Sequence, residues 1–342
     1  MNRPRVAVVL PALDEETTVG SLVRGLLPLT RGRDPLVHDV VVLDSGSTDR
    51  TAVRAAEAGA RVLSREDAVP DVPVLPGKGE ALWRAVVALG ADPEPPDVVC
   101  FLDADLVDPH PDLVPRLVGP LLGDGEQSRG AAGEQSRGAA GEQSRGGGEQ
   151  SRGLVAPQLV KGYHRRPLGG DDGHEGGRVT ELLARPLLAA LRPELGGVRQ
   201  PLGGEFAATR TLLDRLRFAT GYGVDIGLLL DAAALAGPGA IAQVDVGVRR
   251  HRNRPLRELA QTSREVLATA LDRCGVPDSG AGLTAFLPAD AGAATDDPGE
   301  GAGTGTHWTS ATYPLLQVDR PPPGEVRDTA PACPQRTARR AG

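Results

Sequence analysis

The sequence is short of cysteine and of long apolar runs, and each shortage excludes a class of protein. Three cysteines scattered over 342 residues are too few for a disulfide framework or a cysteine zinc site. No apolar run reaches the roughly 18 residues of a membrane span, and no signal-peptide core opens the sequence. A net charge of −7 argues against a general basic surface for nucleic acid. We expect a cytoplasmic protein with no nucleic-acid or membrane partner.

Lysine is the scarcest charged residue. Among 38 Lys and Arg residues, only Lys78 and Lys161 are lysine. Aromatic residues make up 3% of the chain, against 45 Gly and 30 Pro, which indicates a strong compositional bias. We expect the two lysines that persist against this bias to occupy sites that need a compact ammonium charge rather than a guanidinium.

Two stretches lack the apolar residues of a folded core. Residues 123–153 include four copies of Gly-Glu-Gln-Ser-Arg-Gly, which are polar and self-neutralising, so we expect a disordered insertion. Residues 276–342, rich in Gly, Pro, Ala and Asp, are expected to be a largely disordered tail, with one short strand at Tyr313–Val318. The remaining residues, 1–122 and 154–275, would then form two halves of one folded unit.

Short apolar runs alternate with helical patterns in the first half, which predicts a doubly wound α/β sheet. Wholly apolar, β-branched runs are typical of parallel strands that are buried on both faces. The expected strands are Val6–Leu10, Val40–Leu43 and Val98–Leu102. The expected helices are Glu15–Leu27 with a cap at Asp14, Thr51–Ala58 and Gly79–Leu89.

The second half has longer helical patterns and fewer strand candidates, which predicts an α+β continuation of the fold. The expected helices are Arg178–Leu191, Thr209–Leu216, Val224–Ala236 and Pro255–Cys274. The expected strands are Gln158–Tyr163 and Ile241–Val248.

Polar residues follow the expected strands at their carboxyl ends, where doubly wound sheets bind ligands. Asp103 and Asp105 come after the run Val98–Leu102, and carboxylates at positions i and i+2 can approach one hard cation. Such a cation would neutralise charge on a departing diphosphate. The alternative is a pair of solvated turn residues.

Two other segments at strand ends have a structural and a functional interpretation. Asp44–Asp49 forms an Asx turn with a helix cap, or its Asp44 or Ser45 contacts a nucleotide base or ribose. The acids of Pro11–Glu16 likewise cap a helix or contact the edge of a nucleotide.

Taken together, these segments resemble the nucleotide-sugar half of a GT-A glycosyltransferase. Further segments resemble the glucosyl-3-phosphoglycerate synthase family, namely Pro76–Trp83, Leu159–Pro167, Gly177–Leu182, Gln200–Glu205, Gly221–Asp225 and Val248–Pro255. The resemblance covers about residues 4–275 apart from the repeats. It implies a Rossmann-like, mostly parallel sheet flanked by helices in 1–122 and an α+β acceptor-binding part in 154–275.

The resemblance also implies an activity. Such an enzyme moves glucose from UDP-glucose to the 2-hydroxyl of 3-phosphoglycerate with retention of configuration, gives glucosyl-3-phosphoglycerate, needs Mg²⁺ or Mn²⁺, and forms a homodimer. The alternatives are mannosyl transfer to the same acceptor, another GT-A transferase, or an inactive homologue that binds phosphorylated metabolites.

The resemblance carries roles onto individual positions. Those implied for the nucleotide sugar are Pro11, Ala12, Leu13, Glu16, Ser45, Lys78, Asp103 and Ala104. Asp105 and His251 would ligate the metal, with Asp103 on the ribose or on metal-bound water. Those implied for the acceptor are Gly177, Arg178, Thr180, Asn253 and Arg254. Asp225 and the Leu202 backbone would face the sugar, and Asp225, Asp105 and Leu202 form the implied catalytic set.

Three positions depart from the family pattern, which usually has Asn at Asp14, Ser at Ala104 and Glu at Asp225. Ala104 should point away from the metal, so its change is expected to be harmless. Asp225 keeps the charge but is one methylene shorter, so rate or sugar specificity would differ. We expect front-face attack assisted by the departing diphosphate, rather than a covalent intermediate on Asp225.

Overall fold

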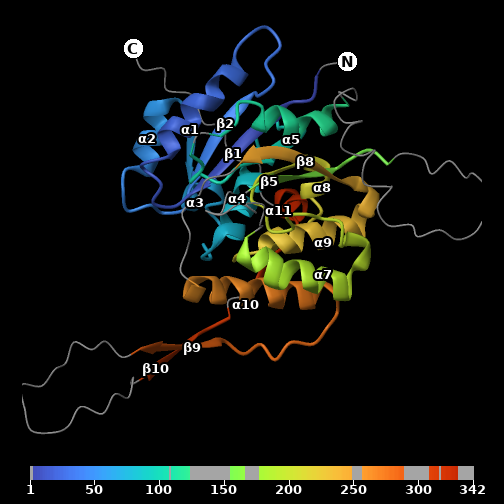
Figure 1. The fold of residues 1–342 in the computed structure, drawn as a ribbon. Helices are drawn as coiled ribbons and strands as arrows, with labels where there is room; N and C mark the ends of the chain where they lie inside the picture. Colours follow the sequence, from blue (N-terminus) through green and yellow to red (C-terminus); the bar gives the residue numbers. More distant parts are fainter. Residues whose placement is uncertain are drawn as a thin grey trace, which may run out of the picture.

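A sheet of seven strands forms the centre of the protein (Figure 1). The computed structural model describes residues 3–107, 109–123, 155–165, 177–248, 256–288, 308–315 and 317–329. Apart from Gly123, the predicted insertion at 123–153 lies outside the described residues. The strands of the sheet are β1 Val6–Ala12, β2 Asp39–Asp44, β3 Arg61–Ser64, β4 Val98–Phe101, β5 Leu159–Arg165, β6 Phe206–Thr209 and β8 Ile241–Val248.

The strand order is β3-β2-β1-β4-β6-β5-β8. The first four strands are mutually parallel, β6 runs antiparallel to both β4 and β5, and β5 pairs in parallel with β8. Val9 lies in register with Val41 on one side and with Phe101 on the other. The expectation of a Rossmann-like, mostly parallel α/β sheet is therefore confirmed.

Helices cover both faces of the sheet, because alternate strand residues point to opposite cores. Val8 and Leu10 pack in one core, whereas Ala7 and Val9 pack in the other. The first layer contains α1 Val19–Leu26, the 3-10 turn η1 Leu27–Thr30, α2 Thr51–Ala58 and α5 Leu113–Leu122. The second contains α3 Arg65–Ala68, α4 Lys78–Gly90, the π-helix η2 Thr180–Ala184, α7 Arg185–Leu191, η3 Pro193–Leu195, α8 Arg210–Leu213, α9 Val224–Ala236, η4 Pro238–Ala240 and α10 Leu256–Arg273. None of the described helices is both long and apolar enough to cross a membrane.

Two predicted helices begin later than expected. The first starts at Val19 rather than at Glu15, and Asp14 does not cap it. Asp14 has a left-handed backbone (φ 56°), and its carboxylate instead accepts a hydrogen bond from the Thr48 amide at 2.7 Å. The predicted helix Thr209–Leu216 shortens to α8, because Thr209 completes β6 and caps that helix with its hydroxyl.

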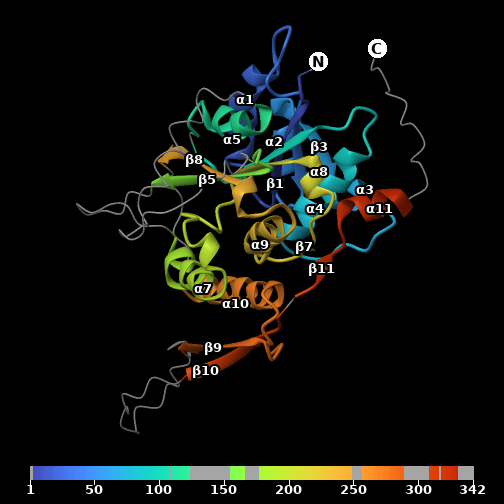
Figure 2. The ribbon, with the colours of Figure 1, turned by 90° about the vertical axis from the view of Figure 1, so that its right-hand side faces the viewer.

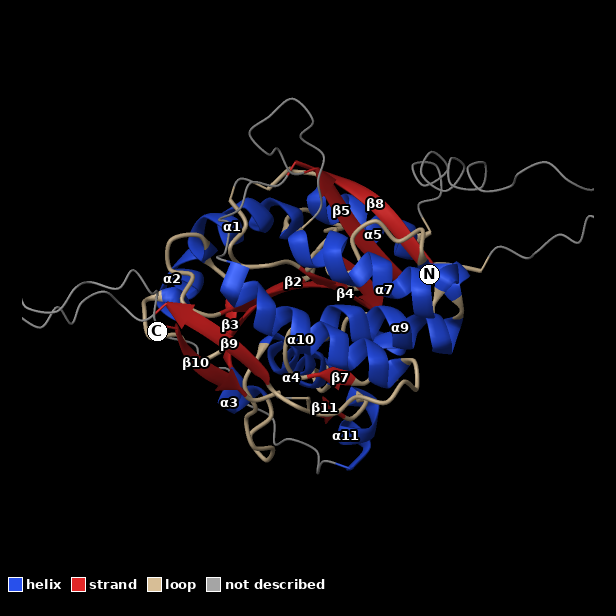
Figure 3. Cartoon of the chain, turned by 60° about the horizontal axis from the view of Figure 1, so that its bottom comes forward, coloured by secondary structure: helices blue, strands red, loops and turns tan. Residues whose placement is uncertain are grey.

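The predicted disordered tail at 276–342 contains regular structure, which corrects that expectation. A hairpin of β9 Leu283–Pro288 and β10 Trp308–Tyr313 stands off the body beyond α10 (Figures 1 and 2). Tyr313 belongs to this hairpin, and the strand that joins the body is β11 Asp319–Arg320, which pairs with β7 Phe218–Ala219. The helix α11 Pro323–Thr329 follows, and it packs on α4. In Figure 3 the hairpin and α11 lie on the same side of the sheet as α10.

Candidate functional site

The carboxyl ends of β1, β2 and β4 bring the predicted nucleotide-binding segments together. The neighbours of β1 are β2 on one side and β4 on the other, so the chain reverses direction across the sheet at β1. Open α/β sheets bind ligands in the crevice at such a switch point. The Ser45 amide, just after β2, donates to the Ala12 carbonyl at 2.8 Å and fixes the two strand ends side by side.

Glu16 ties the loop after β1 to the loop after β2. Its carboxylate accepts from the Arg50 amide at 3.1 Å, and its own amide donates to the Asp49 carboxylate at 3.1 Å. Asp44 accepts from the Ser47 amide at 3.3 Å, three residues on, so the Asx turn in this segment is instead the one at Asp49, which accepts from the Thr51 amide at 2.9 Å. No side chain caps α2. The neighbouring predicted residues are the half-buried Pro11 at the end of β1 and the exposed Leu13.

Residues 103–105, which follow β4, place two carboxylates at the same edge of the sheet. Asp103 and Asp105 are both half-buried, and Ala104 between them is buried in the core. The Ala104 side chain therefore faces the core, as expected. Its side chain adds no polar atom to this edge, so any contact of Ala104 with a ligand would be made by its backbone.

Lys78 joins three distant parts of the chain. Its Nζ lies 3.1 Å from Asp103 Oδ1 and 3.2 Å from Asp225 Oδ2. It is the first residue of α4, and Asp225 lies in the first turn of α9. The preceding Gly77 has φ 106°, and a side chain there would collide with the Thr220 carbonyl. This close approach positions Lys78 against α9.

Lys161 and Glu205 extend this site below the surface, and both are buried. Lys161 Nζ donates to the Gly203 carbonyl at 2.6 Å and lies 5.1 Å from the centre of the Phe206 ring. The two lysines of the sequence thus lie in one charged cluster. For Lys161 only a site that needs a compact charge was predicted, and for Glu205 no role; both lie within segments that carry the family resemblance.

Burial and opposite charges act against each other in this cluster. Burial lowers the pKa of Lys78, but the carboxylates of Asp103 and Asp225 outweigh it and hold that pKa above its usual value. Burial raises the pKa of Asp225, with Lys78 and Lys161 opposing the rise. Burial lowers the pKa of Lys161, an effect that Asp225 partly offsets. Asp225 Oδ1 is buried without a hydrogen-bond partner among the described residues. It can therefore accept a hydrogen bond from a hydroxyl group of a ligand.

The predicted acceptor residues are only partly described. Residue 178 begins a helix that continues through η2 and α7, and the Gly177 carbonyl accepts from the Glu181 amide at 2.9 Å. Arg178 is exposed, whereas Thr180 is buried in η2, which packs on α10. The predicted residues outside the described ranges are His251, Asn253 and Arg254.

Leu202 lies in the turn between η3 and β6. It is half-buried and packs against the core. The Gly203 amide closes this turn on the Gln200 carbonyl at 3.0 Å, while Lys161 holds the Gly203 carbonyl. The Leu202 backbone is therefore held from both sides of the turn.

The side chains at this edge supply oxygen ligands that suit a divalent metal ion. The carboxylates of Asp103 and Asp105 are hard oxygen ligands of the kind that Mg²⁺ and Mn²⁺ prefer. The described residues hold no group of three metal-ligating side chains. That is compatible with Mg²⁺, which commonly takes one or two protein carboxylates and completes its shell with phosphate oxygens and water.

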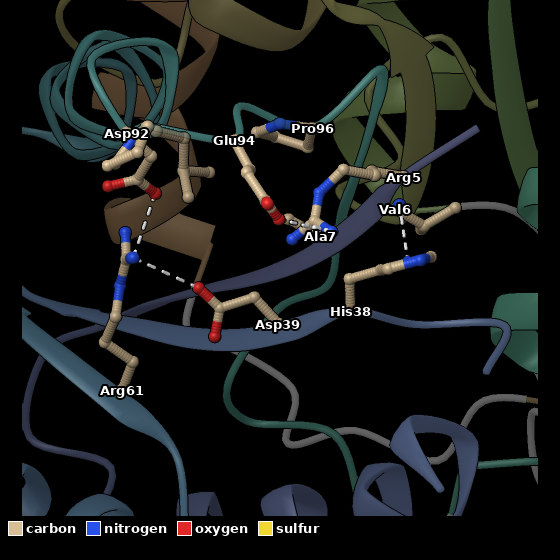
Figure 4. A pocket seen from close by; sticks show the side chains of 11 residues that line it. Arg5, Val6, Ala7, His38, Asp39, Arg61, Asp92, Glu94 and Pro96 are labelled. Carbon is tan, nitrogen blue, oxygen red and sulfur yellow. Dashed lines mark hydrogen bonds and ion pairs between the residues drawn. The ribbon is translucent and has the colours of Figure 1, made fainter. Parts of the chain in front are cut away.

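A cavity of about 330 Å³ lies at the opposite, amino-terminal edge of the sheet (Figure 4). Its charged residues pair with one another: Arg61 lies 2.9 Å from Asp92, and Arg5 lies 2.9 Å from Glu94. His38 Nδ1 accepts from the Val6 amide at 3.2 Å. These charged side chains neutralise one another in pairs, and they lie far from the carboxyl ends of the strands. We therefore do not include this cavity in the candidate site.

Comparison with known proteins identifies relatives over most of the chain, although no protein-family model matches the sequence. The chain is 51% identical over 329 residues to the glucosyl-3-phosphoglycerate synthase of Mycolicibacterium paratuberculosis, covering 94% of this chain and 84% of the relative. It is 35% identical over 272 residues to that of Petrotoga mobilis, covering 79% and 73%.

Solved structures of the Mycobacterium tuberculosis synthase share the fold. One, in complex with Mn²⁺, UDP and glucosyl-3-phosphoglycerate, matches with a TM-score of 0.72 and 49% identity, covering 94% of this chain and 91% of that chain. Another, with Mn²⁺, UDP-glucose and phosphoglyceric acid, gives 0.72 and 50% over the same shares. A third, with Mg²⁺ and UDP, gives 0.73 and 50%, covering 95% and 92%.

The fold, the polar cluster at its carboxyl edge and these matches define a glycosyltransferase. The chain belongs to the glucosyl-3-phosphoglycerate synthase family, as its motifs indicated.

The protonation of His38 predicts how stability changes with pH. Burial, together with Arg5, lowers the pKa of His38 in the folded state. Below the unfolded pKa of about 6.5 the unfolded chain therefore binds more protons, and stability falls as pH falls. His38→Asn keeps an acceptor for the Val6 amide but does not titrate. Between about pH 7.5 and pH 5, urea denaturation should show the wild type losing stability relative to this variant; parallel curves would contradict it.

Proposed function

We propose that the protein transfers glucose from UDP-glucose to the 2-hydroxyl of 3-phosphoglycerate with retention, in the presence of Mg²⁺ or Mn²⁺. The observation that carries this proposal is Lys78 held between Asp103 and Asp225 at the ligand-binding edge of the sheet. The sequence of this chain is 50% identical to that of a synthase whose crystal structure contains UDP-glucose, phosphoglyceric acid and Mn²⁺.

Residues at the strand ends would bind the donor and the metal. The proposed donor-binding residues are Pro11, Ala12, Leu13, Glu16, Ser45, Lys78, Asp103 and Ala104. Asp105 and His251 would hold the metal ion, which supplies Lewis-acid stabilisation of the negative charge on the diphosphate. Lys78 complements it as a compact charge for phosphate oxygens.

The acceptor site is proposed at the helix that begins at residue 178. Amide groups at a helix start, the Arg178 guanidinium and the Thr180 hydroxyl suit a phosphorylated carboxylate. Gly177, Asn253 and Arg254 would complete this pocket. We therefore assign residues 1–122 to the donor and 154–275 to the acceptor, as two halves of one catalytic unit.

The transfer is proposed to proceed on the front face of the sugar. The acceptor 2-hydroxyl oxygen bonds to the anomeric carbon, the bond from that carbon to the diphosphate breaks, and the hydroxyl proton passes to a diphosphate oxygen. Asp225 orients the sugar through its buried, unpartnered Oδ1, and the Leu202 carbonyl borders the same sugar. The ion pair with Lys78 holds the Asp225 carboxylate in place and makes it a poor nucleophile.

The thiols of the chain support a cytoplasmic location. Cys100 and Cys274 are free, and free thiols are typical of a reducing compartment. We propose that the enzyme works there.

Turnover with a donor panel tests the activity. Purified protein with Mg²⁺ and 3-phosphoglycerate is expected to convert UDP-glucose to a product with the mass and anomeric NMR signal of an α-linked glucosyl-3-phosphoglycerate. A product from a mannose donor alone would identify mannosyl transfer. Acceptor binding without any product would point to an inactive homologue instead.

Two aspartates provide a matched pair for the metal assignment. Asp105→Asn should lower kcat by about 10²- to 10³-fold, because it removes a ligand of the charge-stabilising ion. Asp112→Asn removes an exposed carboxylate seven residues away and should leave kcat unchanged. Full activity in Asp105→Asn would refute the assignment.

Asp225 separates the two retaining mechanisms. Asp225→Ala should lower kcat by about a hundredfold, because the sugar loses its positioning carboxylate. Azide should not restore the rate, and intact-protein mass spectrometry with a fluorinated donor should detect no glycosyl adduct on the wild type. Rescue by azide, with formation of a glycosyl azide, would establish a covalent intermediate on Asp225.

We propose that a second copy of the chain covers the β9–β10 hairpin in a homodimer. Phe286 and Trp308 are 68% and 61% exposed on one face of this hairpin, and an isolated two-stranded sheet is at best marginally stable. In sedimentation velocity the wild type should be dimeric and the double variant Phe286→Ser/Trp308→Ser monomeric. Val53→Ser, on the exposed side of α2, should remain dimeric; a dimeric hairpin variant would contradict the interface.

A further inference from the structure

The last described segment of the chain, residues 317–329, returns to the body of the protein. We call it the C-terminal strap. Its strand β11 pairs with β7, with Asp319 opposite Ala219 and Arg320 opposite Phe218. The buried Trp83 indole in α4 donates to the Pro321 carbonyl at 2.7 Å. The strap is therefore built into the fold, on the side of the sheet that carries α4 (Figure 2).

Arg320 grips a buried carboxylate at the start of α4. Its Nε lies 2.6 Å from Glu80 Oε2 and its NH2 lies 2.8 Å from Glu80 Oε1. This two-pronged contact fixes both the position and the plane of the carboxylate. The Arg320 guanidinium also lies 4.9 Å from the centre of the Trp83 ring. Glu80 follows Lys78 by two residues, so the strap holds the turn of helix from which Lys78 projects.

Glu80 also orders the chain that leads into Lys78. Its Oε1 accepts from the Leu75 amide at 3.2 Å and from Arg84 Nε at 2.6 Å. Arg84 is fully buried and donates to the carbonyls of Val69 and Val72. One carboxylate thus connects the strap, the loop before Lys78 and the first turns of α4.

The strap is also hydrogen-bonded to the segment that precedes Asp225. The Thr220 amide donates to the Val318 carbonyl at 3.0 Å, and the Thr220 carbonyl accepts from the Glu80 amide at 3.1 Å. Asp225 follows Thr220 by five residues, in the first turn of α9. Both partners of the Lys78–Asp225 ion pair therefore stand on backbone that the strap holds.

We propose that Arg320 is a positioning residue for the transfer: by holding Glu80 it fixes Lys78 relative to Asp225 and so sets the affinity of the site for the nucleoside diphosphate. This inference rests on the proposed function, in which Lys78 contacts the diphosphate. Loss of Arg320 leaves Glu80 paired with Arg84, so the buried carboxylate keeps a cation and the fold persists.

The test compares two arginines of the strap. Arg320→Gln removes the grip on Glu80, whereas Arg327→Gln removes an ion pair between α11 and Asp214 that does not involve Glu80. The full-length proteins are titrated with UDP in the presence of Mg²⁺, and kcat and both KM values are measured. Arg320→Gln should weaken UDP binding about tenfold and raise the donor KM accordingly, with the 3-phosphoglycerate KM unchanged. Arg327→Gln should match the wild type in all three.

Arg320→Lys keeps one cationic contact to Glu80 without the two-pronged geometry, so its UDP affinity should fall between those of the wild type and Arg320→Gln. Equal UDP affinities for Arg320→Gln and Arg327→Gln, or equal losses for donor and acceptor, would overturn the positioning role. Failure of the wild type itself to bind UDP would instead overturn the proposed function. If Arg320→Gln does not fold, the donor-specific loss must appear in Arg320→Lys, and its absence there would overturn the inference.

Discussion

The site depends on one half-buried cation, the ammonium group of Lys78. It lies between the carboxylates of Asp103, in the loop after β4, and Asp225, in α9. These two ion pairs hold three segments of the chain together. Removing one partner of the Lys78–Asp225 pair leaves an uncompensated charge in a largely buried place, which costs more than losing an exposed ion pair. Lys78 therefore couples the geometry of the site to the stability of the fold around it.

The elements that the sequence predicted well are those that its patterns specify locally. The apolar runs of β1, β2 and β4 are buried on both faces of the sheet, and the long apolar run of α9 is buried on most sides of the helix. Such burial follows directly from residue type. By contrast, β6 contains only Phe206–Thr209, lies antiparallel between β4 and β5, and has no pattern that distinguishes it from a loop. The strand β11 has just two residues, and pairing with β7, a hundred residues earlier, defines it.

The site divides in the same way. Asp103 and Asp105 were predicted because they follow a buried apolar run, and Asp225 because the segment Gly221–Asp225 carries the family resemblance. The direct contact of Lys78 with Asp225 was not predicted, because it joins residues 147 positions apart. Arg320 went unnoticed for a further reason: it follows a Gly- and Pro-rich stretch whose composition indicates disorder, and only its contact with Glu80, 240 positions away, gives it a place. Composition indicates how much apolar surface a segment can bury by itself, but not which contacts the rest of the folded chain makes with it.

The charges of the cluster give a physical reason why a reaction here requires a divalent ion. Lys78 and Lys161 supply two positive charges, whereas Asp103, Asp105, Asp225 and Glu205 supply four negative ones when ionised. Among the described residues, the cluster thus has an excess of two negative charges at the edge where we propose that the diphosphate binds. Lys78 cannot neutralise the diphosphate without weakening its hold on Asp103 and Asp225. A divalent cation held by the carboxylates would remove this conflict, because it would balance their charge and leave the ammonium group available to the phosphate.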